Sequence, residues 1–168
     1  MRVRDLPRAA FVDHFGGVFE HSPWVAQAAF DAGLDASCDT ASGLHALMSR
    51  AMMAGDDVQK LALIMAHPDL AGRLALAGRL TAESTREQAS AGLDQLTDEE
   101  RARFTELNDA YKARFGFPFI MAVKGRSKGE IMEAFERRIA HDSTREFATA
   151  LDEISRIARL RLGDMLAG

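Results

Sequence analysis

The fold is decided by residues 143–162, which read STREFATALDEISRIARLRL. Within this stretch Phe147, Leu151, Ile154 and Ala158 recur at steps of four, three and four. That spacing places them on one face of an α-helix and is typical of a face that packs into a core. The stretch therefore predicts a long helix with one buried face.

The next step of three along this face reaches Arg161. A guanidinium is thus expected on the core side, where it is costly unless an anion or hydrogen-bond acceptors meet it. A second explanation stays open, since an arginine near a helix end can extend its charge to solvent and interact favourably with the C-terminal dipole.

Helix signals dominate the rest of the chain, whereas β signals are weak. The expected helices cover residues 7–15, 24–32, 40–54, 58–66, 84–91, 97–115, 127–139 and 143–162. Capping boxes, the Ser/Thr-x-x-Glu pattern that begins a helix, start at Ser84, Thr97, Ser127 and Ser143. Mostly short loops join these segments, so the chain is predicted to be all-α: a single compact domain of about eight helices over residues 1–168.

Two helices carry further local signals. Ser22 is expected to cap the helix at 24–32, with Pro23 at the first helical position. On the helix at 58–66, Val58, Leu61 and Met65 share one side.

Composition excludes several classes of function. The 168 residues include 47% hydrophobic and 27% charged residues and carry a net charge of −4, as in an ordinary globular domain without a basic patch for nucleic acid. No apolar run is long enough to span a membrane. The single cysteine, Cys38, excludes an internal disulfide and a paired-cysteine zinc site, and the histidines lack metal-ligand spacing, so no metal site is assigned.

The segment His67-Pro68-Asp69-Leu70-Ala71-Gly72 ends an apolar helical run. Proline disfavours the α conformation in the residue before it, so the helix is expected to end near His67. An imidazole at a helix C-terminus has its protonated form favoured by the dipole, which makes His67 a candidate acid. A histidine that merely marks a helix end is the other interpretation.

Residues 117–123 form an apolar run that contains Pro118 and follows the helix stop at Gly116. The run is too short for a helix of its own, so it is expected to be an extended segment buried near the site. An extended segment leaves peptide groups that can bind a ligand.

Five segments together resemble the OHCU decarboxylase family, the 2-oxo-4-hydroxy-4-carboxy-5-ureidoimidazoline decarboxylases of urate breakdown. They are FEHSPW at 19–24, HPDLAG at 67–72, ESTREQ at 83–88, RFGFPFI at 114–120 and EISRIARLRL at 153–162. They occur in order, and the resemblance covers nearly the whole chain.

The resemblance implies a carboxy-lyase, generally a homodimer, that converts OHCU to (S)-allantoin and CO2 without a cofactor. It makes His67 the catalytic acid, assisted by Glu87 and Arg161. The substrate-binding residues that it implies are Pro68, Ser84, Thr85, Arg86, Glu87, Gln88, Phe119, Ile120, Met121, Ala122 and Val123. For Glu87, a helix-capping use remains open, because it occupies the last position of a capping box.

Two other functions stay open at this point. The first is a related cofactor-free enzyme acting on another ureido or imidazolone acid, and the second is a non-catalytic helical binding domain. The ending Met165-Leu166-Ala167-Gly168 is not a peroxisomal signal, and arginine strongly outnumbers lysine. We therefore expect a bacterial, cytoplasmic protein with a small-molecule substrate.

Overall fold

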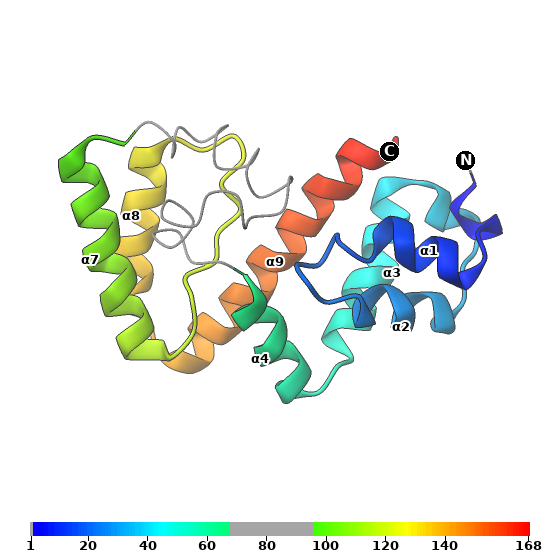
Figure 1. Cartoon of the computed structure of the whole chain (residues 1–168), viewed down its shortest axis with the longest axis horizontal. Coiled ribbons are helices and arrows are strands. Elements are labelled where there is room, and N and C mark those ends of the chain that lie inside the picture. Colours follow the sequence, from blue (N-terminus) through cyan, green and yellow to red (C-terminus); the bar gives the residue numbers. More distant parts are fainter. Residues whose placement is uncertain (1, 68–95) are drawn as a thin grey trace. The chain divides into compact units, whose positions relative to one another are not determined.

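The computed structural model describes residues 2–67 and 96–168, and these are helical with no β-strand (Figure 1). The α-helices are α1 (Arg8–Phe15), α2 (Trp24–Ala32), α3 (Ala41–Met53), α4 (Asp57–Ala66), α7 (Asp98–Phe115), α8 (Lys128–Arg138) and α9 (Ser143–Met165), with 3₁₀-helices η1 (Val3–Asp5) and η2 (Ala36–Asp39). The all-α prediction is confirmed. The described residues hold seven α-helices, and the expected helix at 84–91 lies outside them.

The chain divides into two compact units. The first comprises Met1–His67 with Ile154–Gly168, and the second comprises Pro68–Glu153. Helix α9 contributes its first half to the second unit and its second half to the first. That the whole chain forms one domain stays a prediction.

The core of the first unit is built from one apolar face of each of its helices. Helix α2 packs against both α1 and α3. The fully buried side chains include Phe11, Phe15, Val25, Leu44, Met48, Met52, Leu63, Ile64, Ala158 and Leu162. Of these, Ala158 is one of the residues of α9 that the spacing in the sequence predicts to be buried.

Residues adjacent to helix α4 in the sequence determine where it begins and ends. Asp56 caps its N-terminus in a capping box with Gln59, and His67 follows its last turn in the extended conformation that a following proline favours. The apolar side that contains Val58 is exposed, Val58 by 78%, whereas Leu63 and Ile64 are buried. The buried His67 lies four residues after Leu63 and three after Ile64, so this side also has helical spacing and periodicity alone could not decide which side packs.

The second unit places α7 beside α8, and residues 117–123 pack against both (Figure 1). Gly116 ends α7 in the left-handed conformation that glycine adopts without strain. Residues 117–123 then form neither helix nor strand and are buried throughout. The prediction of a buried, non-helical run is confirmed.

Two capping predictions are confirmed and two are wrong. Thr97 and Ser127 form capping boxes at the starts of α7 and α8. Ser22 does not cap α2: its hydroxyl donates to the Glu20 carbonyl, and Pro23 precedes the helix. Ser143 does not cap α9 either. The cap is Asp142, whose carboxylate accepts from the Arg145 N–H at 2.8 Å.

Candidate functional site

His67 lies at the C-terminus of α4 and is 4% exposed. Its backbone N–H bonds the Ile64 carbonyl, which leaves the Leu63 carbonyl to the side chain: Nδ1 lies 2.9 Å from that oxygen. A carbonyl oxygen only accepts, so Nδ1 carries a hydrogen and donates it. The ring thereby caps its own helix, and the proton that the imidazole gains or loses is the one on Nε2.

Arg161 is buried, 4% exposed, as its position on the α9 face predicts. Its Nη1 donates to Glu20 Oε2 at 2.8 Å and to the Val18 carbonyl at 3.2 Å. Glu20 is fully buried, so the two charges form an ion pair within the first unit. A carboxylate of the chain itself therefore pairs with Arg161, and it belongs to a residue that the sequence analysis did not single out.

A tight turn directs Glu20 inward. His21 has a φ of 47°, a left-handed conformation that residues other than glycine rarely adopt. The Ser22 N–H bonds the Phe19 carbonyl across this turn, and the Ser22 hydroxyl holds the Glu20 carbonyl. The His21 side chain is exposed and the Glu20 carboxylate is fully buried, with His21 Nε2 4.0 Å from Glu20 Oε1.

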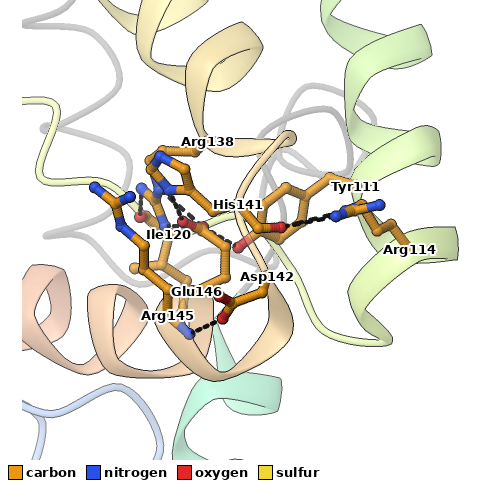
Figure 2. Close-up of polar contacts among 8 residues, drawn as sticks. All are labelled: Tyr111, Arg114, Ile120, Arg138, His141, Asp142, Arg145 and Glu146. Carbon is orange, nitrogen blue, oxygen red and sulfur yellow. Dashed lines mark hydrogen bonds and ion pairs between the residues drawn. The ribbon is translucent and has the colours of Figure 1, made fainter.

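In the second unit, a buried polar cluster holds the apolar run at residues 117–123 (Figure 2). We call Tyr111, Arg138, His141 and Glu146 the Glu146 network. Glu146 Oε1 accepts from the Tyr111 hydroxyl at 2.6 Å and from Arg138 Nε at 2.9 Å, and Oε2 lies 2.9 Å from His141 Nδ1. From this network Arg138 Nη1 donates to the Ile120 carbonyl at 2.6 Å.

The electrostatics of the network favour an ionised Glu146 and a neutral Tyr111. Burial alone would raise the pKa of Glu146, but hydrogen bonds from Tyr111 and Arg138, the Arg138 charge and the His141 contact outweigh it, and the pKa lies below its usual value. Burial, and then the hydrogen bond to Glu146, raises the pKa of Tyr111 well above its usual value. The phenol is therefore a permanent donor at neutral pH.

Tyr111 gives a direct test of this arrangement, because it is the only tyrosine of the chain. We expect its tyrosinate absorbance in the native protein to appear far above the pH of about 10 at which an unfolded tyrosine titrates. A raised native pKa means that the neutral phenol contributes stability in full below that pH, and that the contribution is lost as the pH rises toward the native pKa. The measurement is an ultraviolet pH titration of native and urea-unfolded protein.

The control for this titration is Glu146→Gln, which keeps the shape of the side chain and removes its charge. We expect the native titration of Tyr111 to move toward lower pH in this variant. Native and unfolded protein that titrate alike would contradict the buried hydrogen bond.

The structure places the predicted site residues in three groups. His67 and Arg161 lie in the first unit, and Phe119, Ile120, Met121, Ala122 and Val123 lie in the second. Pro68 and the predicted stretch Ser84, Thr85, Arg86, Glu87 and Gln88 lie outside the described residues.

Sequence reasoning missed Glu20, Arg138 and Glu146 as partners. The usable signal was the buried guanidinium of Arg161, which requires a carboxylate nearby.

Residues 2–67 and 96–168 contain neither a cluster of metal ligands nor a membrane-spanning helix. No three His, Cys, Asp or Glu side chains in these ranges are grouped so that they could hold a metal ion. Among the same residues, no helix is long and apolar enough to cross a membrane.

Known proteins similar to this chain match it from end to end. A family model described as OHCU decarboxylase matches residues 4–163. A 2-oxo-4-hydroxy-4-carboxy-5-ureidoimidazoline decarboxylase of Halalkalicoccus jeotgali is 44% identical over 98% of this chain and 92% of its own length. Enzymes of the same name from Haloferax volcanii (44% identical, 97% of this chain, 93% of the relative) and Bos taurus (37%, 98% and 95%) match similarly.

Two solved structures share the fold. The crystal structure of (S)-allantoin synthase matches with a TM-score of 0.77 and 32% identity over 98% of this chain, which spans 52% of that longer chain. The structure of an OHCU decarboxylase in the presence of (S)-allantoin matches with a TM-score of 0.71 over 91% of this chain and 96% of that one. At 21% identity the second likeness shows the fold alone. From the family model and the close relatives together, this chain belongs to the OHCU decarboxylase family.

Proposed function

We propose that this chain catalyses the decarboxylation of OHCU to (S)-allantoin and CO2 in urate degradation. The observation that carries the proposal is the match over nearly the full length to relatives that are named for this substrate and this reaction. The likeness to (S)-allantoin synthase, at 32% identity, supports the same product.

The protein does not have to supply an electron-accepting group for this reaction, because the substrate contains its own electron sink. The departing carboxylate of OHCU lies next to a ring carbon–nitrogen double bond. When the carbon–carboxylate bond breaks, its electron pair moves into that double bond, and a proton then adds to the ring. The protein has to orient the carboxylate out of the ring plane, bind the developing charge and control the face that is protonated.

His67 is the proposed proton donor. Its Nδ1 hydrogen is committed to the Leu63 carbonyl, so the acid is the imidazolium and the proton transferred is the one on Nε2. The bond to the helix carbonyl also holds the ring orientation. A donor held in one orientation protonates one face of the ring, which a product of single chirality requires.

The remaining roles concern substrate binding. Glu87 and Gln88 are proposed to accept and donate hydrogen bonds to the ureido and ring groups, with Pro68, Ser84, Thr85 and Arg86 beside them. The peptide groups of residues 119–123 are proposed to bind the edge of the ring. Arg161 carries N–H groups on Nε, Nη1 and Nη2, and we propose that its guanidinium meets a substrate oxygen as well as Glu20.

Two further features follow from the family and complete the proposal. We propose a homodimer, as the resemblance implies, and a cytoplasmic location. Light scattering of the purified protein at micromolar concentration tests the first, and a mass of one chain, 18.4 kDa, would contradict it.

The experiment for the reaction generates OHCU in the cuvette from urate with urate oxidase and hydroxyisourate hydrolase. We expect the purified chain to accelerate the ultraviolet decay of OHCU and to yield (S)-allantoin in excess by chiral chromatography. A reaction without the chain gives the spontaneous rate and a racemic product as the control. Decay at that spontaneous rate with racemic allantoin would contradict the proposed function.

A further inference from the structure

The Glu146 network is more elaborate than the packing of two helices requires. Its ion pair is almost completely buried, with Arg138 4% exposed and Glu146 fully buried. Replacing such a pair by apolar side chains of similar volume is often neutral or stabilising, so a buried pair is weak evidence for a role in stability. A different role for the network follows from the residues that it holds in place.

Arg138 contacts two neighbouring residues of the apolar run. Its Nη1 donates to the Ile120 carbonyl at 2.6 Å, and its guanidinium lies 4.3 Å from the centre of the Phe119 ring. The opposite arm of the guanidinium is fixed by Glu146, which accepts from Nε and lies 2.9 Å from Nη2. Because the guanidinium is planar, a carboxylate that binds one edge also fixes the direction of the N–H groups on the opposite edge.

Aromatic packing holds the same residues from α7 and α8. The Phe119 and Phe135 rings stack at 3.9 Å with an interplanar angle of 11°, and Tyr111 meets Phe119 edge-on at 5.4 Å. Tyr111 also donates its hydroxyl to Glu146, so one side chain joins the aromatic cluster to the ion pair. The position of the run therefore depends on Arg138, Glu146 and Tyr111 together.

The contact with Ile120 sets the direction of the next peptide group. The described residues contain no cis peptide bond, so the Ile120–Met121 peptide is trans. In a trans peptide the C=O and the following N–H point in opposite directions. With the Ile120 carbonyl directed at Arg138, the Met121 N–H is directed away from the network.

We propose that Arg138, oriented by Glu146, is a positioning residue that fixes the peptide groups of residues 119–123 for binding of the substrate ring. This inference rests on the proposed function, because it takes that run to be substrate-binding. Arg138 acts through the Ile120 carbonyl and does not itself touch the substrate. The substrate group recognised is a hydrogen-bond acceptor on the ring edge, such as a ring carbonyl, which the Met121 N–H meets.

The test separates this role from a purely structural one. Removal of Arg138 alone would leave the buried Glu146 carboxylate without the guanidinium that it pairs with, and such a variant can fail to fold. We therefore choose the double variant Arg138→Met/Glu146→Gln, which removes both charges and the donor to Ile120 but keeps side-chain volume. A loss of folded protein lowers the apparent kcat and leaves KM unchanged, whereas misplaced binding groups raise KM.

We expect KM for OHCU to rise about 10-fold in this variant, in line with the loss of one hydrogen bond from the Met121 N–H to the substrate, with far-UV circular dichroism unchanged. The matched control is Arg103→Met/Glu136→Gln, the same substitutions in an exposed pair that joins α7 and α8 at 3.2 Å. Its KM is expected to equal that of the wild type.

Each outcome decides between the alternatives. An unchanged KM in the double variant, with an active wild type, overturns the positioning role and leaves the proposed function standing. A wild type that does not accelerate OHCU decay overturns both. If the double variant does not fold, Arg138→Lys serves in its place: it keeps a cation beside Glu146, but one ammonium group cannot span Glu146 and Ile120 as the fork does. The same rise in KM is then expected, and its absence overturns the role.

Discussion

Replacing His67 by asparagine is expected to lower kcat/KM for OHCU about 10²–10⁴-fold, which is the usual contribution of a positioned proton donor. Asparagine can still donate to a carbonyl, so the bond that caps α4 can be kept in part, but no group at this position can then give up a proton. We expect the variant to fold, with the fluorescence of Trp24, the single tryptophan, unchanged. The rate is measured by the ultraviolet decay of enzymatically generated OHCU.

His45→Asn is the matched control for this substitution. His45 is partly buried, and its Nε2 lies 2.9 Å from the Ser155 carbonyl oxygen, so it shares with the buried His67 a contact to a backbone oxygen. Burial lowers the pKa of His45 below its usual value, and the ring is neutral at pH 7. We expect a wild-type rate from this control. A folded His67→Asn variant that keeps a near wild-type rate would exclude His67 as the acid.

The helix boundaries were predictable because they depend on neighbours in sequence. Thr97 and Glu100 satisfy backbone N–H groups three residues apart, and Pro68 restricts the residue directly before it, so His67 ends α4 as expected. The burial of residues 117–123 was equally visible, since an apolar run after a helix stop has to pack somewhere. None of these features requires knowledge of a distant partner.

The capping box predicted at Ser143 is wrong because a neighbouring residue caps the helix and Glu146 pairs with distant residues. Both Asp142 and Ser143 can cap a helix, and the Ser143 pattern would have used Glu146 as the reciprocal cap. Instead Glu146 accepts from Tyr111, 35 positions away, and Arg138, 8 positions away. A carboxylate that is paired with a buried cation does not accept from the first backbone N–H groups of its own helix. The spacing of residues within one segment cannot reveal that cation.

Arg161 is a second residue whose distant partner the sequence does not reveal. Periodicity predicted correctly that its side chain turns inward, and electrostatics required an acceptor there. The acceptor is Glu20, 141 positions earlier. A single sequence holds no signal that joins two such positions, so the pair became visible only in the structure, although Glu20 lies within the family segment at residues 19–24.

The second large effect expected is on stability: Arg161→Met should lower the free energy of unfolding by about 3–5 kcal/mol, because it removes the cation from the buried ion pair with the Glu20 carboxylate. For a chain of this length that corresponds to a fall in Tm of roughly 6–20 °C. Thermal and urea unfolding followed by Trp24 fluorescence report on the unit that contains the pair. The control is Arg159→Met on the same helix, where Nη2 lies 3.5 Å from the Gly168 carbonyl oxygen, and it is expected to unfold like the wild type.

The double variant Glu20→Gln/Arg161→Met separates the two tasks that we assign to Arg161. It also replaces the Glu20 carboxylate by a neutral amide, so most of the lost stability should return, since a neutral pair of similar shape replaces the ion pair. Activity responds differently under the two interpretations. If Arg161 only balances Glu20, the rate recovers along with stability; if its guanidinium also meets a substrate oxygen, the rate stays low in a folded protein. We expect the second result, and a fully active double variant would confine Arg161 to the ion pair.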